Sequence, residues 1–291
     1  MNLALSGINF SRAFAAFACL LAPLWFFGFG AAEALTALGP KAKVVGAGVL
    51  AIPYLVFALG TPDYNVRAAV IVIALPVLLA AFLELPKLPQ RMTWRDAAVL
   101  AIVVASYFLK WLQGAWPNPA LALLPKLFLA DIVAYCFLVI RNIDGAGYSL
   151  APRRSAVIVG FRECVFYLPI ALILGELTGF VHFHAALPSF GKVLAAIIVT
   201  SLLVALPEEL FFRAVLQNLF ETRLGKTAAL LVTSVLFGIS HFNHAAFNWR
   251  YVLLASIAGV FYGRAWRKDR QILAAIITHT GVDVVWSLWF R

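Results

Sequence analysis

The chain has 291 residues, of which 63% are hydrophobic and 12% are charged. Soluble domains are about 45–50% apolar and about 25% charged, so this composition excludes a soluble enzyme, a disordered protein and a secreted disulfide scaffold. The net charge of +10 is interpreted as Lys and Arg in cytoplasmic loops, and no nucleic-acid partner is expected. We therefore expect an integral membrane protein whose surroundings are the lipid bilayer.

Apolar stretches recur along the whole sequence. The first, Ala13 to Ala32, is too long for a typical signal peptide and is interpreted as a retained span. The stretches lie near residues 10–35, 44–60, 66–85, 97–112, 120–140, 155–181, 193–220, 228–248, 250–266 and 272–290. Since no alternating ten-residue pattern indicates a barrel, the fold predicted is an all-α, polytopic transmembrane helix bundle of about eight to ten spans.

The basic residues of the loops alternate along the chain. The odd-numbered loops carry Lys41, Lys43, Lys87, Arg91, Arg95, Arg141, Arg153, Arg154, Arg223, Lys226, Arg264, Arg267, Lys268 and Arg270. The even-numbered loops carry only Arg67, Lys192 and Arg250. This bias predicts ten spans, with the odd loops cytoplasmic and both termini outside.

Ionisable residues divide the chain into two parts. Up to about residue 190 the apolar runs contain few of them, whereas spaced pairs appear in the later spans. We expect residues 1–190 to form N-terminal transmembrane helices with a possible role in substrate docking, and residues 191–291 to form a catalytic core. No internal repeat is visible, which disfavours a transporter that uses the buried charges as a proton relay.

Two adjacent glutamates follow an apolar run in the sequence SLLVALPEELFFR, residues 201–213. Arg213 lies four residues after Glu209, on the same helix face, so these two are expected to form an ion pair. Glu208 points about 100° away from this pair, which makes it the candidate general base. Pro207 removes a backbone N–H and is expected to loosen the helix and admit water. The alternative is a helix end with snorkelling charges.

Two further pairs stand at helical spacing in later spans. Phe237 and His241 are four residues apart, as are His279 and Asp283. A hairpin turn near Leu224 would place Glu208 and His241 at similar depth, where they could share a water. A lone intramembrane His often only packs, but three such pairs favour one common site. Asn243, His244 and Asn248 are expected at its rim.

A zinc site is the chemical alternative. His241, His279 and either Glu208 or Asp283 are acceptable zinc ligands. The sequence has no HExxH motif and no cysteine-rich ligand set, and the ligands would come from three separate helices. We therefore expect no metal and no other cofactor.

The ordered set Glu208-Glu209-x-x-x-Arg213, Phe237-x-x-x-His241 and His279-x-x-x-Asp283 resembles the CAAX-processing and bacteriocin-processing (CPBP) family of intramembrane proteases. These are relatives of the type II CAAX prenyl endopeptidase. The resemblance covers about residues 193–290 and implies a glutamate-dependent protease, although members have also been treated as metalloproteases. It implies that Glu208 and His241 activate the water.

The resemblance also implies supporting roles. Glu209 and Arg213 would support the site, and His279 with residue 283 would stabilise the oxyanion. Eukaryotic-type relatives have Asn at that last position, where this chain has Asp283. Ionised Asp only accepts hydrogen bonds, so Asp283 would orient and charge His279 instead.

The sequence therefore favours an intramembrane endopeptidase that cleaves a membrane-associated peptide or protein tail, in the inner (cell) membrane of a bacterium. The alternatives are a zinc-dependent version of the protease and a non-catalytic interaction or immunity protein on the same scaffold. A pseudoenzyme would be free to lose the motif residues, so their retention favours the enzyme.

Overall fold

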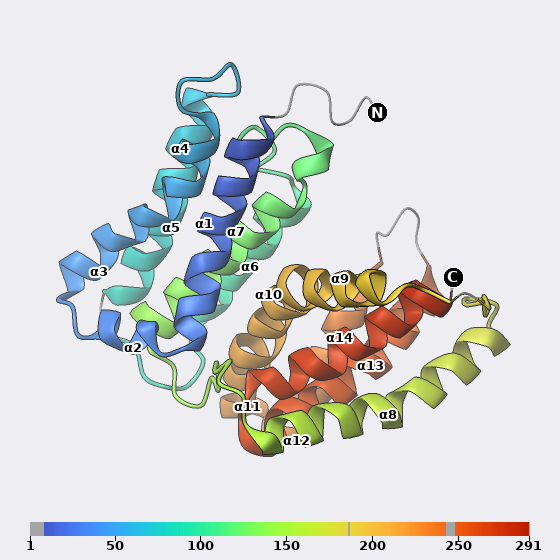
Figure 1. Cartoon of the computed structure of the whole chain (residues 1–291). Coiled ribbons are helices and arrows are strands. Elements are labelled where there is room, and N and C mark those ends of the chain that lie inside the picture. The colour runs from blue at the N-terminus through green and yellow to red at the C-terminus, as the bar shows by residue number, and fades with distance from the viewer. Residues whose placement is uncertain (1–8, 86, 186, 243–247, 291) are drawn as a thin grey trace. The chain divides into compact units, whose positions relative to one another are not determined.

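The computed structural model describes residues 9–85, 87–185, 187–242 and 248–290 and consists of helices (Figure 1). Over these ranges no strand forms, and Phe183 and Phe290 make an isolated antiparallel bridge. The chain divides into two compact units, Met1–Asp144 and Gly145–Arg291. The predicted all-α membrane bundle is confirmed.

The first unit contains shorter and more broken helices than the second. Its elements are α1 (Phe10–Gly28), α2 (Ala31–Thr36), α3 (Pro40–Gly46), the 3₁₀ segment η2 (Ala47–Ala51), α4 (Ile52–Ala58), α5 (Val66–Glu84), α6 (Trp94–Phe108), the 3₁₀ segment η3 (Pro119–Leu121), α7 (Leu123–Ala134) and the π-helical η4 (Tyr135–Ile140). Polar side chains define where two of these helices begin. Asn65 caps α5, and Thr93 forms a capping box with Asp96 at the start of α6.

A buried ion pair holds the end of the first unit in place. The Nε atom of Arg141 donates to Oδ1 of Asp96 at 2.6 Å, and its Nη2 donates to the carbonyl of Pro89 at 2.9 Å. Arg141 was counted among the loop charges of the sequence, but its side chain is buried.

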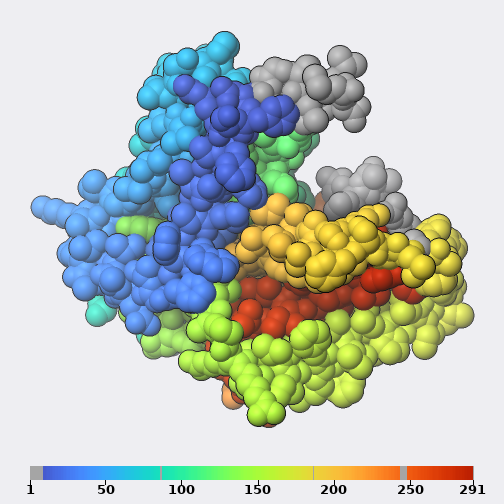
Figure 2. All heavy atoms as spheres, in the orientation of Figure 1, coloured from blue at the N-terminus to red at the C-terminus, as the bar shows by residue number. Residues whose placement is uncertain are grey.

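The second unit holds all the residues that the sequence singles out for catalysis. Its elements are α8 (Arg154–Leu177), α9 (Phe190–Thr200), the π-helical η5 (Ser201–Ala205), α10 (Leu206–Glu209), the π-helical η6 (Leu210–Gln217), α11 (Asn218–Leu224), α12 (Lys226–Ile239), α13 (Trp249–Asp269) and α14 (Ile272–Trp289). In this unit α13 packs against α8, α12 and α14, and α14 also packs against α8 and α9. Figure 2 shows red atoms of α14 in a strip between the yellow atoms of α9 and the yellow-green atoms of α8.

Seven of the described helical segments are long and apolar enough to cross a membrane: Phe10–Gly28, Pro40–Ala58, Val66–Glu84, Pro119–Ile140, Arg154–Leu177, Phe190–Leu224 and Ile272–Trp289. The other three predicted stretches are helices that fall short of this standard. α6 and α12 have 15 and 14 residues, and α13 is long enough but carries charged residues near both ends. The chain is an integral membrane protein.

Small residues let the helices of the second unit approach closely. A Cβ atom added at Gly281 would lie 2.7 Å from Sγ of Cys164 in α8, and one added at Gly160 would lie 2.7 Å from Cβ of Ile277 in α14. Gly281 therefore allows α14 to approach α8 closely. The second compact unit begins at Gly145 and therefore includes α8. The boundary expected at residue 190 separates two functions, docking and catalysis, and it stays a prediction.

The long segment Phe190–Leu224 is irregular on both sides of Pro207. π-Helical turns precede it at Ser201–Ala205 and follow the two glutamates at Leu210–Gln217. Proline removes one backbone donor, and π-turns within α-helices often lie at functional sites. These π-helical turns on either side of Pro207 are the irregularity of the helix that the sequence predicts there.

Candidate active site

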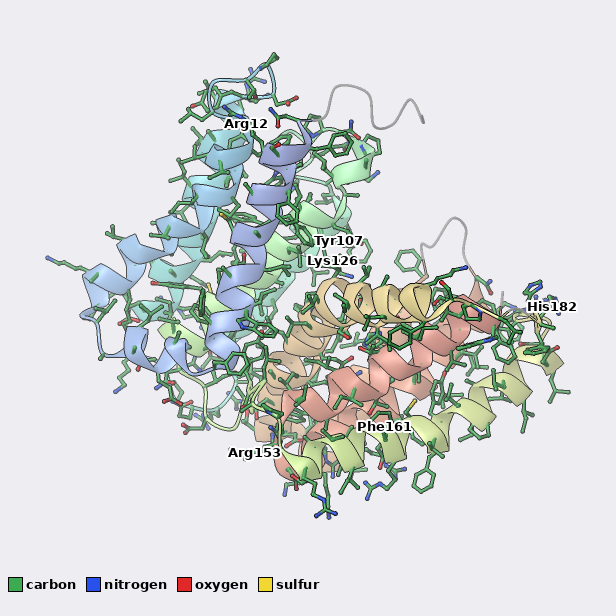
Figure 3. All side chains as sticks on the ribbon, viewed as in Figure 1. Arg12, Tyr107, Lys126, Arg153, Phe161 and His182 are labelled. Carbon is green, nitrogen blue, oxygen red and sulfur yellow. The ribbon has the colours of Figure 1, made fainter. Side chains whose placement is uncertain are left out.

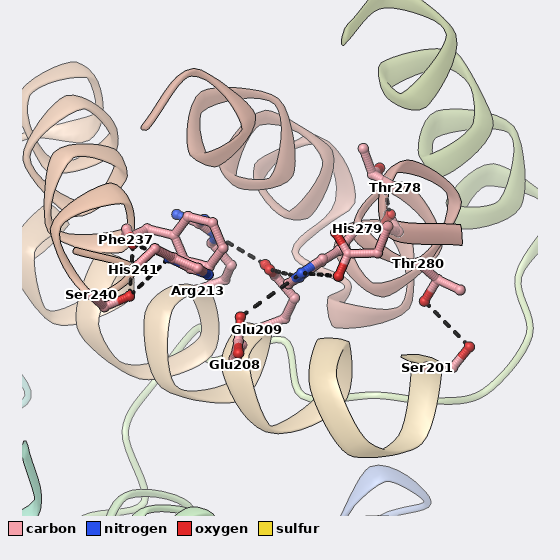
Figure 4. Close-up of polar contacts among 12 residues, drawn as sticks. Ser201, Glu208, Glu209, Arg213, Phe237, Ser240, His241, Thr278, His279 and Thr280 are labelled. Carbon is pink, nitrogen blue, oxygen red and sulfur yellow. Dashed lines mark hydrogen bonds and ion pairs between the residues drawn. The ribbon is translucent and has the colours of Figure 1, made fainter. Parts of the chain in front are cut away.

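The three polar pairs of the sequence come together within the second unit (Figure 4). Glu208 and Glu209 end α10, and Arg213 lies one turn later in η6. The other two pairs lie on α12 with the residues just after it, and on α14. The convergence expected from helical spacing is therefore present.

Glu209 is the most fully engaged carboxylate of the site, and its side chain is 0% exposed. Its Oε2 accepts a hydrogen bond from Nε of Arg213 at 3.0 Å, which is the predicted ion pair. Its Oε1 lies 2.8 Å from Nδ1 of His279. One buried carboxylate thus joins the η6 helix to α14, and this second contact was not expected from the sequence.

Arg213 is also completely buried. Its guanidinium carbon lies 5.3 Å from the ring centroid of Phe237 and 6.0 Å from that of Phe212. A cation over an aromatic face is stabilised by the ring quadrupole. The aromatic partner of the second pair, Phe237, therefore packs against the cation of the first.

His279 is held on three sides. Its Nδ1 atom meets Glu209, while its Nε2 atom lies 3.4 Å from Oδ2 of Asp283 and 3.9 Å from Oε2 of Glu208. The ring of Tyr262 in α13 stacks on the imidazole, with centroids 4.5 Å apart and an interplanar angle of 16°. These contacts therefore fix both the position and the ring plane of the His279 imidazole.

His241 lies directly after α12 and is partly buried. Its Nδ1 atom lies 2.8 Å from the carbonyl oxygen of Phe237 and 3.2 Å from the hydroxyl of Ser240. A carbonyl only accepts, so Nδ1 carries the proton and Nε2 is left as the basic nitrogen. His241 and Glu208 are close enough to interact electrostatically.

Glu208 differs from its neighbour in exposure. Its side chain is 15% exposed, against 0% for Glu209. The two glutamates therefore have different surroundings, as their angular separation on a helix requires.

Of the three residues expected at the rim of the site, the structure describes one. Asn243 and His244 lie outside the described residues. The side chain of Asn248 accepts a hydrogen bond from the backbone N–H of Arg250 and caps α13. The visible task of Asn248 is therefore structural, and its place at the rim stays a prediction.

Four residues of the site were missed by sequence analysis. Tyr262 stacks on His279, the ring of Tyr251 lies 5.0 Å from that of His241, Phe212 packs on Phe237, and Ser240 contacts His241. The two tyrosines lie on α13, which carries none of the three motifs. Their only signal is a spacing of eleven residues, which places them on nearly the same helix face.

Two replacements of Tyr262 distinguish the effect of its ring, which stacks on His279, from the effect of its hydroxyl group. We expect Tyr262→Phe to keep most of the activity because the ring plane is preserved, whereas Tyr262→Leu should lower kcat by about tenfold, or about 1.4 kcal/mol, within the range of an aromatic pair. Steady-state peptide cleavage, the activity that the sequence resemblance implies, measures the difference between the two purified variants. Equal rates would show that the stack does not position His279.

The side chains do not form an evident metal site. Within the described ranges, no group of three or more His, Cys, Asp or Glu residues is placed to hold one ion. Nδ1 of His279 is directed at Glu209, and Nδ1 of His241 at a backbone carbonyl. This arrangement favours hydrogen bonding of both imidazoles, and the absence of a cofactor remains a proposal.

The part of the chain that contains the site residues is similar to a known protein family. Residues 190–285 match the family described as type II CAAX prenyl endopeptidase Rce1-like. This stretch is about a third of the chain, and over it the chain is similar to the Rce1-like family. The match contains all three polar pairs, and the recognition made from their spacing is confirmed. No curated protein and no solved structure matches the chain.

The family match indicates a general class of enzyme. The matched model is described as a type II CAAX prenyl endopeptidase, so the similarity points to an intramembrane protease of the CAAX type. Together with the apolar helices, this similarity points to a membrane-embedded peptide or protein as the kind of substrate to test.

Proposed function

We propose that the chain is an endopeptidase in which Glu208 activates the attacking water. The observation that carries this proposal is the contrast between the two glutamates. Glu209 is fully buried and binds Arg213 and His279, whereas Glu208 is partly exposed beside the same imidazole. A carboxylate that must take up and release a proton needs access to water, so Glu208 is the better base.

His241 is the proposed partner of Glu208 in holding the water. The contact of its Nδ1 with the Phe237 carbonyl leaves Nε2 as an acceptor. A water between Glu208 and Nε2 could give one hydrogen bond to each. Glu208 would take the proton as the water oxygen bonds to the scissile carbonyl carbon, and would then pass it to the leaving amine as the C–N bond breaks.

His279 is the proposed stabiliser of the oxyanion. With both nitrogens protonated, it donates from Nδ1 to Glu209 and presents Nε2–H beside Glu208 and Asp283. A donor held in place before the charge develops lowers the barrier because it needs no rearrangement. Asp283 orients His279, and Glu209 with Arg213 supports it from the other side.

The proposed substrate is a peptide or protein tail associated with the membrane. Asp283 is 28% exposed on α14, and part of α14 is visible on the surface of the second unit in Figure 2. This open strip supports approach of a substrate along α14. Docking by the helices of residues 1–190, and a location in the inner membrane of a bacterium, belong to the same proposal.

Chelation tests whether the reaction depends on metal. We expect the purified, active protein to contain no stoichiometric metal and to keep its activity after exhaustive chelation, because the proposed base is a carboxylate. The measurement is elemental analysis combined with cleavage assays before and after chelation. Activity that is lost on chelation and restored by zinc would overturn the metal-free mechanism and recast the two histidines as ligands.

A further inference from the structure

Two arginines on the surface of the second unit are not among the residues that form the active site. Arg162 on α8 and Arg264 on α13 have side chains that are 42% and 47% exposed. Glu163 lies between them and is completely buried. Its Oε1 atom lies 2.7 Å from Nη2 of Arg162, and its Oε2 atom lies 3.2 Å from Nε of Arg264.

This cluster is short of one negative charge. A single carboxylate serves two guanidinium groups, so the three side chains carry a net positive charge at neutral pH. The surroundings of Arg162 are apolar, since Ile158, Phe161 and Val165 on α8 are 55%, 61% and 62% exposed. An uncompensated charge on a membrane-facing surface is costly and marks a functional site by default.

The position along the helices places the cluster near one membrane interface. Arg162 lies eight residues after the start of α8, or about 12 Å, and Arg264 lies five residues before the end of α13, or about 8 Å. Arg153 and Phe161, labelled in Figure 3, mark this part of the chain. Long arginine side chains can reach from such depths to the headgroup layer.

Most of the neighbouring charges are also basic, although Asp269 ends α13 and Glu221 pairs with Arg267 and Arg270. Arg153 and Arg154 stand at the beginning of α8, and Arg267 and Lys268 stand in the last turn of α13. All belong to loops that the charge bias assigns to the cytoplasmic side. Basic clusters between transmembrane helices on that side bind anionic lipid headgroups.

We propose that Arg162 and Arg264 bind the phosphate group of an anionic phospholipid, with Glu163 holding the two guanidinium groups apart and in place. The planar guanidinium groups offer paired donors to phosphate oxygens. The bound lipid would bridge α8 and α13. Since α13 carries Tyr262, which stacks on His279, and α8 packs on α14, this lipid would also stabilise the framework of the active site.

The test is lipid binding by the full chain in detergent, with phosphatidylglycerol as the probe and phosphatidylcholine as the neutral reference. The variants are Arg162→Gln and Arg264→Gln. Each leaves one arginine to neutralise Glu163, so both are expected to fold. Each should bind phosphatidylglycerol about fivefold more weakly, since one arginine near the membrane surface contributes about 1 kcal/mol.

Arg67→Gln is the matched control. It removes the same charge from the exposed first turn of α5, in a loop assigned to the opposite side, and should bind as the unmodified protein does. Inorganic phosphate alone should not raise the melting temperature as phosphatidylglycerol does. Unchanged binding in both variants, an equal loss in Arg67→Gln, or equal stabilisation by free phosphate would overturn the proposal.

Discussion

Replacing Glu208 with Gln is expected to lower the rate constant for peptide cleavage by about 10²–10⁴, the usual contribution of a general base. The amide keeps the size of the side chain but cannot accept a proton from water. The network of Glu209, Arg213 and His279 does not depend on Glu208 for its short contacts, so the variant should remain folded. Single-turnover cleavage of a reconstituted peptide by the purified protein measures the loss.

A matched control distinguishes the loss of a base from the loss of a charge. Glu33→Gln makes the same chemical change at an exposed position in α2 and should leave cleavage unchanged. Near-normal activity in Glu208→Gln would show that another group takes the proton.

Replacing Glu209 with Ala is expected to act on stability first. Arg213 would then be a buried cation without its carboxylate, and His279 would lose its contact at Nδ1. Breaking a buried ion pair by removing one partner costs about 3–5 kcal/mol. We expect poor expression and a lower melting temperature as well as lost activity, measured by thermal unfolding in detergent.

A double variant provides the control for Glu209. Replacing a buried pair by apolar residues of similar size is often neutral, so Glu209→Leu with Arg213→Met should recover much of the lost stability. Activity should not return, because His279 still lacks its support. A single variant as stable as the unmodified protein would contradict a structural role for the buried pair.

The sequence was sufficient to predict the fold class because lipid leaves few options. A chain that is 63% hydrophobic with apolar runs along its length can satisfy its backbone in the membrane only as helices or a closed barrel. The number of spans was harder to predict. α6 and α12 are short, and the polar ends of α13 lower its hydropathy, so hydropathy does not decide how these helices cross.

The site was predictable where contacts lie within one helix. The ion pair of Glu209 with Arg213 follows from a spacing of four residues, and so does the approach of His279 to Asp283. The contact of Glu209 with His279 depends on how two distant helices are rotated, which spacing does not determine. Tyr262 was missed for the same reason, since its helix carries no motif.

The most direct test of the central claim is a comparison of protein termini in membrane fractions of cells that contain either the unmodified chain or Glu208→Ala. An endopeptidase that depends on Glu208 predicts that a defined set of membrane proteins has new C-termini only with the unmodified chain. The uncut forms of the same proteins should accumulate with the variant. Identical termini in the two membranes, with both chains present in equal amounts, would contradict proteolysis and favour a non-catalytic membrane protein on the same scaffold.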